Sequence, residues 1–186
     1  MDSYQIIAGN FQATIEAISM TVDEIADDLA NASELAVASL LAEGKLLAAG
    51  SGADQALAQL LARQMMGACH RERPALPAIA LSGEGETPGA TDQSLAGQLR
   101  ALGQAGDVLV LICADAGEYP ASVQAATERG LAVIGLCRLD SAGILAANGQ
   151  IAVNLALPDE QQRTALSTMA LASLLQLIET GLFGPE

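Results

Sequence analysis

The sequence predicts an α/β fold, in which a five-stranded parallel sheet lies between two layers of helices and follows an N-terminal helical arm. Beyond residue 44, short apolar runs alternate with helical segments, and this order favours parallel strands joined by right-handed crossovers. The chain of 186 residues is 51% hydrophobic but only 2% aromatic. We therefore expect a core of Ala, Leu, Ile and Val, as in sheets whose strands are buried on both faces.

Residues 5–42 are predicted to form one long helix, ended by Gly44. Apolar side chains recur every three or four residues, which places them on one helical face. They are Ile7, Phe11, Ile15, Ile18, Val22, Ile25 and Leu29. A stripe this long either packs on its own domain or joins copies of the chain. We favour residues 1–44 as an arm that forms a homo-oligomer, either a tetramer or a dimer. Residues 45–186 then form a single α/β domain.

The remaining elements are assigned from their apolar runs and from the positions of proline, which falls at element edges. The predicted strands cover residues 45–49, 76–81, 107–114, 131–137 and 151–157. The predicted helices cover residues 53–67, 92–102, 120–129, 141–147 and 160–180.

Charge and cysteine content exclude several classes of protein. The formal net charge of −14 leaves no basic surface for direct nucleic-acid binding. Cys69, Cys113 and Cys137 are widely spaced and odd in number, which argues against a disulfide framework and fits a reducing compartment. We find no leader sequence and no run of membrane-spanning length, so we expect a cytoplasmic protein without membrane contacts.

Three segments resemble the sugar isomerase (SIS) family. They read ERPALPAIAL over residues 72–81, RALGQAGDVL over 100–109 and LIETGLF over 177–183. They are similar to segments of bacterial phosphoheptose isomerases and of the DnaA initiator-associating DiaA proteins. The resemblance covers essentially the whole chain and implies the SIS fold, a homotetramer built through N-terminal helices, and a sugar-phosphate site.

The first loop of that site departs from the family pattern. Relatives read CGNGGSAxDAxH, whereas residues 49–60 read AGSGADQALAQL. Gly50, Ser51 and Gly52 still allow a tight turn into a helix N-terminus, but Asp54 replaces the phosphate-binding serine. A carboxylate about 4 Å from a phosphate oxygen costs roughly 4 kcal/mol at an effective dielectric constant near 20. We expect Asp54 to cap the helix instead.

The second loop departs in the same direction. The hydroxyl-rich ISTSGNS of relatives becomes ICADAGEY over residues 112–119. Cys113, Asp115 and Glu118 would line the altered pocket, and the loop gains two negative charges. An alternative is that Asp54, Asp115 and Glu118 bind a divalent cation or an amine. The Gly-Ser-Gly run is only a weak match to a dinucleotide-binding fingerprint.

The resemblance also implies positions for the zinc ligands of phosphoheptose isomerases, on the helix after the first loop and on the last helix. These positions fall on Leu60, Gln64, Thr164 and Ser167. Zinc prefers imidazole, thiolate and carboxylate ligands, and isomerisation needs a base, so these side chains are unsuitable. We therefore expect no catalytic residue, metal or cofactor.

The leading hypothesis is a non-catalytic SIS-domain protein that acts through protein–protein contacts. The resemblance to DiaA suggests a replication initiator as partner, with Leu182, Phe183 and the acidic surface as contacts, although the same pair could cover a sheet end in a neighbouring subunit. The basic cluster over residues 69–73 is expected to form surface or inter-subunit salt bridges. Alternatives are a phosphoheptose isomerase or sugar-phosphate-binding protein with a rebuilt site, and a sensor of an uncharged or cationic sugar derivative.

Overall fold

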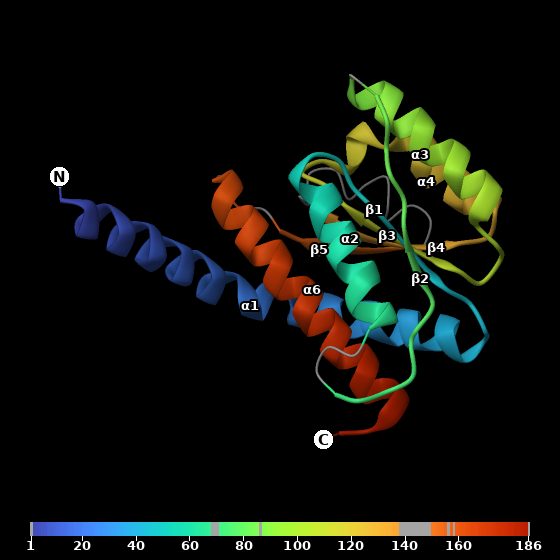
Figure 1. Cartoon of the computed structure of the whole chain (residues 1–186), viewed down its shortest axis with the longest axis horizontal. Coiled ribbons are helices and arrows are strands. Elements are labelled where there is room, and N and C mark those ends of the chain that lie inside the picture. The colour runs from blue at the N-terminus through green and yellow to red at the C-terminus, as the bar shows by residue number, and fades with distance from the viewer. Residues whose placement is uncertain are drawn as a thin grey trace.

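The computed structural model describes residues 2–67, 71–85, 87–137, 150–155, 157 and 159–185. Its strands form one parallel sheet in the order β2-β1-β3-β4-β5 (Figure 1). The strands are β1 (Leu46–Ala49), β2 (Ala78–Ala80), β3 (Val108–Ile112), β4 (Ala132–Cys137) and β5 (Ile151–Asn154). The predicted five-stranded parallel sheet is confirmed.

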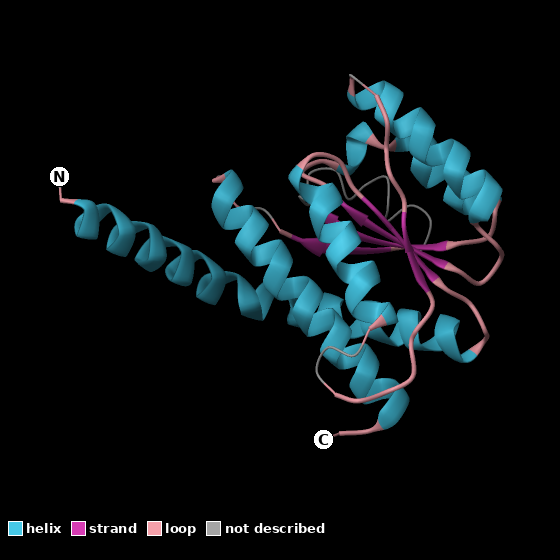
Figure 2. Ribbon diagram, in the orientation of Figure 1, coloured by secondary structure: helices cyan, strands magenta, loops and turns pink. Residues whose placement is uncertain are grey.

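Helices cover both faces of the sheet and make three layers (Figure 2). One face carries α1 (Ser3–Leu41), α2 (Ala53–Met66) and α6 (Glu160–Phe183). The other carries α3 (Pro88–Leu102) and α4 (Pro120–Glu128), with the short 3-10 turn η1 (Ala116–Glu118) before α4. The predicted helix over residues 141–147 lies outside the described residues.

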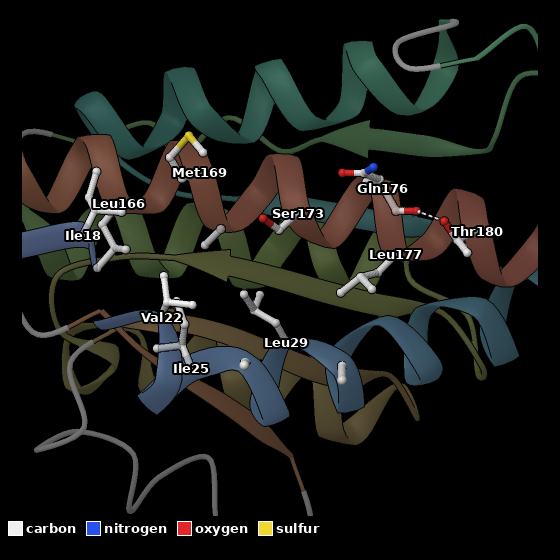
Figure 3. A pocket seen from close by; sticks show the side chains of 13 residues that line it. Ile18, Val22, Ile25, Leu29, Leu166, Met169, Ser173, Gln176, Leu177 and Thr180 are labelled. Carbon is white, nitrogen blue, oxygen red and sulfur yellow. Dashed lines mark hydrogen bonds between the residues drawn. The ribbon is translucent and has the colours of Figure 1, made fainter. Parts of the chain in front are cut away.

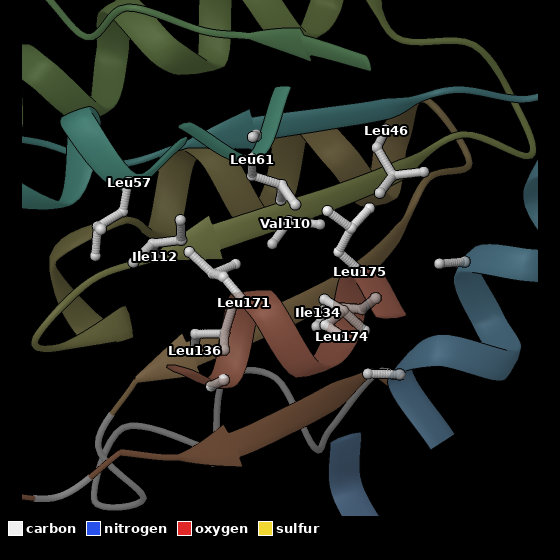
Figure 4. Close-up of a cluster of buried hydrophobic side chains, with 14 of the residues drawn as sticks. Leu46, Leu57, Leu61, Val110, Ile112, Ile134, Leu136, Leu171, Leu174 and Leu175 are labelled. Carbon is white, nitrogen blue, oxygen red and sulfur yellow. The ribbon is translucent and has the colours of Figure 1, made fainter. Parts of the chain in front are cut away.

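The strands are buried on both faces, and alternate side chains enter two separate cores. Leu46 and Ala48 pack toward α1, α2 and α6, where Leu171, Leu174 and Leu175 of α6 meet the sheet (Figure 4). Leu47 and Ala49 point to the opposite core, beneath α3 and α4. The low aromatic content is therefore compatible with a close-packed interior built from small and branched aliphatic side chains.

Several predicted boundaries differ by a few residues. The strand predicted over 76–81 is reduced to Ala78–Ala80, because Pro77 cannot donate to the ladder. The helix predicted from residue 92 begins at Pro88, where Thr87 accepts a hydrogen bond from the Ala90 amide and Pro occupies the first turn.

The two halves of α1 have different surroundings. Ile25 and Leu29 are buried in the core, whereas the first turns project from the domain (Figure 1). Phe11 and Ile15 are 69% and 64% exposed. The division into an arm of residues 1–44 and a domain of residues 45–186 stays a prediction, since the second half of α1 packs as part of the domain.

Among the described residues, α6 is long and apolar enough to cross a membrane, by length and composition only. This differs from the prediction that no run of the sequence reaches membrane-spanning length. Its apolar side chains have another explanation. Leu171, Leu174 and Leu175 are buried against the sheet, and the helix also packs on α1 and α2. Core helices of globular proteins pass the same test, so this is weak evidence for a membrane span.

Candidate functional site

The candidate site lies where the carboxyl ends of β1 and β3 meet. From β1 the chain crosses to β2 on one side, while β3 lies on the other side of β1. In open parallel sheets, the loops leaving two such strands diverge, and ligands bind in the crevice between them. Here these loops are residues 50–52 and residues 113–119, so the structure brings the two predicted parts of the pocket together.

The first loop depends on two glycines. A Cβ atom on Gly50 would lie 2.7 Å from the Asp54 carbonyl group and 2.9 Å from the carbonyl oxygen of Ile112, so no side chain fits there. Gly52 has φ of 56° and is the N-cap of α2. This left-handed conformation favours glycine. The loop therefore has the tight backbone turn that the sequence predicts.

Asp54 does not cap α2, so that prediction is wrong. Its carboxylate lies in the first turn of the helix and accepts two hydrogen bonds from Arg163 of α6, at 3.0 and 3.1 Å. Both side chains are buried, with 8% and 4% of their surface exposed. A buried carboxylate needs a cation and hydrogen bonds to remain charged, and the planar guanidinium of Arg163 supplies both.

Arg163 also binds Glu160, one turn earlier on α6. Its Nε and Nη2 atoms donate to the Glu160 carboxylate at 3.1 and 2.5 Å. These hydrogen bonds and the charge of Arg163 lower the pKa of Glu160, and the contact with Glu160 raises the pKa of Arg163. Two carboxylates therefore share one guanidinium, and the group of three side chains keeps a net charge of −1.

A second carboxylate occupies the N-terminus of α4. Asp92 of α3 is buried and accepts hydrogen bonds from the amides of Ala121 and Ser122 at 2.8 Å each. The Ser122 hydroxyl also donates to it, at 2.6 Å. Helix N-termini are natural anion sites because their first amides lack partners within the helix. At α4 the chain fills that place with its own side chain.

Tyr119 connects the two loops across the crevice. Its hydroxyl lies 2.7 Å from the Ser51 hydroxyl, and its side chain is buried. Burial raises the pKa of Tyr119, partly opposed by the hydrogen bond with Ser51. An aromatic ring therefore fills space beside the loop that the family resemblance assigns to phosphate binding.

The other predicted pocket residues are separated by their environments. Asp115 is exposed and accepts a hydrogen bond from the Gly117 amide at 2.7 Å, which caps η1. Glu118 is exposed, and Cys113 is buried. Within the described parts of the chain, no three His, Cys, Asp or Glu side chains form a group that could hold a metal. The prediction that Asp54, Asp115 and Glu118 bind a divalent cation is therefore wrong, and the alternative of an amine at these residues stays a prediction.

The four positions that the resemblance assigns to zinc do not present a zinc-binding set. Leu60 is exposed on α2, and Gln64 is half-buried nearby. Thr164 donates to the backbone of Glu160, and the Ser167 hydroxyl is buried without a hydrogen-bond partner among the described atoms. Neutral amide, hydroxyl and aliphatic groups are poor zinc ligands, so the donor set does not fit the metal.

The C-terminal end of α6 contacts the basic cluster. Arg71 lies over the ring of Phe183, 5.7 Å from its centre, and donates to the carbonyl of Gly184. Arg73 forms a buried ion pair with Glu179 at 2.6 Å. The prediction of a surface or inter-subunit role is wrong for Arg73, whose partner is within the same chain. Cys69 and His70 lie outside the described residues.

The predicted partner contacts Leu182 and Phe183 differ in exposure. Leu182 is half-buried and packs against the core, while Phe183 keeps 37% of its surface exposed. Of the two, Phe183 is better placed to contact a partner.

Sequence reasoning missed Arg163, Asp92 and Tyr119. Arg163 carried a usable signal, because it is one of only eight Lys and Arg residues in an acidic chain and lies near the start of the last predicted helix. Asp92 and Tyr119 carried none, since Asp is common in a first helical turn and Tyr is common at loop ends.

This geometry accompanies similarity to known proteins over most of the chain. Residues 10–137 match the SIS domain, and the chain belongs to the SIS domain family. Its sheet and helices have the SIS fold of the phosphoheptose isomerase GmhA from Neisseria gonorrhoeae, with a TM-score of 0.83 and 28% identity. That likeness covers 96% of this chain and 100% of the other.

Two curated relatives are equally similar in sequence and carry different names. A phosphoheptose isomerase of Alkalilimnicola ehrlichii is 32% identical over 197 residues, with 99% of each chain covered. A DnaA initiator-associating protein DiaA of Yersinia pestis is 32% identical over 187 residues, with 95% of each chain covered. Overall sequence similarity therefore does not distinguish an isomerase from a DiaA-like protein. The residues of the site are the better guide to which of the two functions the chain has.

Proposed function

We propose that this chain is a non-catalytic SIS-domain protein that acts through protein–protein contacts, as the DiaA name of one group of relatives suggests. The observation that carries the proposal is the buried pair of Asp54 and Arg163 at the N-terminus of α2. A sugar phosphate bound there would have to displace Asp54 from Arg163. The displaced carboxylate would remain buried without a partner, which costs several kcal/mol.

Two further features support the proposal. The N-terminus of α4 already holds the carboxylate of Asp92, and Tyr119 fills space between the two loops. A helix N-terminus typically stabilises a nearby anion by about 0.3–1 kcal/mol. That gain is too small to displace either the Asp92 carboxylate or the Tyr119 ring. A phosphate dianion is therefore a poor ligand for this crevice.

The proposed contact surface is on the helices rather than in the crevice. The exposed first half of α1 continues into an apolar groove of about 510 Å³ between α1 and α6 (Figure 3). Apolar side chains dominate its walls, among them Ile18, Val22, Ile25, Leu29, Leu166, Met169 and Leu177. We propose that a second copy of the chain covers this face, so that the protein is a homo-oligomer. A continuous exposed apolar surface of this kind is typical of an interface.

The first experiment tests binding to the replication initiator. DnaA of the same organism is titrated into the protein and the mass of the complex is followed by light scattering. We expect a complex at micromolar concentrations, weakened by Phe183→Ala. Leu102→Ala, which changes another exposed apolar residue at the end of α3, is the matched control. Absence of any complex at these concentrations contradicts the initiator as partner.

The second experiment tests the rival function, an isomerase or sugar-phosphate-binding protein with a rebuilt site. Thermal unfolding is measured with and without sedoheptulose 7-phosphate, and turnover is assayed in parallel. A ligand at 100 times its dissociation constant stabilises the folded state by about 2.7 kcal/mol, so binding would be visible. We expect no shift for the natural chain. Turnover, or a clear shift, would show that the crevice still accepts the phosphate.

Asp54→Ser sharpens this second experiment. The variant removes the competing carboxylate and leaves Arg163 paired with Glu160, so the chain should still fold. If Asp54 is what excludes the phosphate, the variant should gain a thermal shift that the natural chain lacks. If both proteins fail to respond, the crevice is closed by other groups, of which Tyr119 is the first to test.

A further inference from the structure

A pair of reduced cysteines lies at the carboxyl ends of two neighbouring strands, and the proposed function does not use it. Cys137 is the last residue of β4, and Cys113 directly follows β3. Both are buried and neither is in a disulfide. Neither takes part in the ion pairs of the crevice described above.

The strand register places the two cysteines opposite each other. Ile112 pairs with Leu136, and the Cys113 amide continues the ladder by donating to the Leu136 carbonyl at 3.1 Å. The next pair along the two strands is therefore Cys113 with Cys137. Neighbouring strands lie about 4.7–4.9 Å apart, which falls inside the Cα separation of roughly 4.4–6.8 Å that disulfides span.

The side chains also point the same way. Both belong to the core beneath α3 and α4, as expected for a directly opposed pair in a parallel sheet. Their thiols are joined by a side-chain hydrogen bond. Cβ vectors that point apart would forbid a disulfide, but this arrangement meets the requirement.

We infer that Cys113 and Cys137 are an oxidation site, at which hydrogen peroxide joins the two strand ends through an intramolecular disulfide. The Cys113 thiolate attacks one peroxide oxygen, which breaks the O–O bond and gives a sulfenic acid and hydroxide. The Cys137 thiolate then attacks the sulfenic sulfur and expels a second hydroxide. The two thiol protons neutralise both hydroxides, so two thiols and one peroxide give one disulfide and two waters.

The reaction should be slow but possible in the folded chain. The hydrogen bond with Cys137 and then burial raise the pKa of Cys113, which keeps the thiolate scarce. The path from solvent to the Cys113 thiol is short, however, because the next residue, Ala114, is partly exposed and Asp115 is exposed. Peroxide is small enough to use local openings of such a loop. This inference does not depend on the proposed function.

Mass spectrometry tests the inference on the folded, full-length protein. The chain is incubated with hydrogen peroxide, unfolded, and alkylated with N-ethylmaleimide before digestion. We expect two alkylation sites to be lost, a peptide pair linking Cys113 to Cys137, and recovery of both thiols with dithiothreitol. A Cys69→Ser variant should behave in the same way, which separates this pair from the third cysteine.

Two results would overturn the inference. One is full alkylation of both cysteines after prolonged exposure of the folded chain to peroxide. The other is oxidation of Cys113 to the sulfinic acid while Cys137 remains a thiol. Cys113→Ala and Cys137→Ala should each abolish the linked peptide. If either of these variants fails to fold, the result for Cys69→Ser is sufficient to decide.

Discussion

Two regions of the molecule differ in whether their side chains have partners within the chain. One is the crevice at the ends of β1 and β3, and the other is the outer face of α1. In the crevice, Asp54, Asp92 and Tyr119 all find partners within the chain, and those partners come from other elements. On α1, Phe11 and Ile15 are exposed and have no cover within the domain. The polar side chains of the crevice therefore satisfy one another, whereas the surface left uncovered on α1 is apolar.

This difference between the crevice and α1 indicates which surface is available to bind another molecule. A site prepared for a ligand keeps polar groups available for it, whereas a closed network of buried polar pairs makes a rigid and specific core. An exposed apolar surface of some length favours contact with another protein. The chain thus retains the family's fold while its exposed features favour association. The experiments below break or sharpen this contrast.

The largest expected effect is on the buried ion pair. Arg163→Ala leaves the Asp54 carboxylate buried without its cation, and we expect the free energy of unfolding to fall by about 3–5 kcal/mol in urea titrations. Arg100→Ala is the matched control, because its pair with Glu128 has side chains 45% and 48% exposed. That change should cost less than about 1 kcal/mol. Equal losses would contradict a closed crevice.

The next effect concerns the exposed face. Ile15→Asp places a charge in the apolar stripe of α1, and we expect the oligomer to dissociate at least about 100-fold more readily, equal to about 2.8 kcal/mol. Light scattering coupled to gel filtration measures the change in mass. Ala13→Asp adds the same charge two residues away, on the opposite side of the helix, and should leave the mass unchanged. A natural chain that is monomeric at all concentrations would refute the interface.

A smaller effect is expected for the contact across the crevice. Tyr119→Phe removes the hydrogen bond to Ser51, and we expect a loss of about 1 kcal/mol in the free energy of unfolding at pH 7. Because burial raises the pKa of Tyr119 above 10, its contribution should be complete below pH 10 and be lost as the pH rises through the folded-state value. The variant should therefore lose less stability than the natural chain above pH 10. Tyr4→Phe, at an exposed position, should change neither quantity.

The smallest effect is on Glu160. Its pKa is lowered below 4.5 by Arg163, so its stabilising contribution is present above pH 4.5 and is lost as the pH falls through the folded-state value. The side chain is 66% exposed, and solvent screening limits the contribution to roughly 0.5 kcal/mol. Glu160→Gln should lose this amount at pH 7 and match the natural chain near about pH 2, as measured by urea unfolding. If the two proteins differ in free energy of unfolding by the same amount at every pH in that range, the effect comes from packing and not from charge.

Local sequence patterns were sufficient for most of the fold. Alternating apolar runs identified the strands, and the three- and four-residue spacing from Ile7 to Leu29 identified α1. Such patterns report which sides of an element are apolar, and this is enough to order elements into layers. They do not show which distant side chains meet. Leu182 and Phe183 were named as a pair, but only the packing of α6 shows that Phe183 is the more exposed.

By itself the sequence determined the layers, the two glycines of the first loop and the loss of hydroxyl groups from the second. Only the tertiary structure decided what Asp54 does, because its partner Arg163 lies 109 residues further along the chain. The physical reason is that the first turns of α2 carry no basic side chain, so the cation that this buried carboxylate requires must come from another element. Only the packing of α6 against α2 brings that cation within hydrogen-bonding distance.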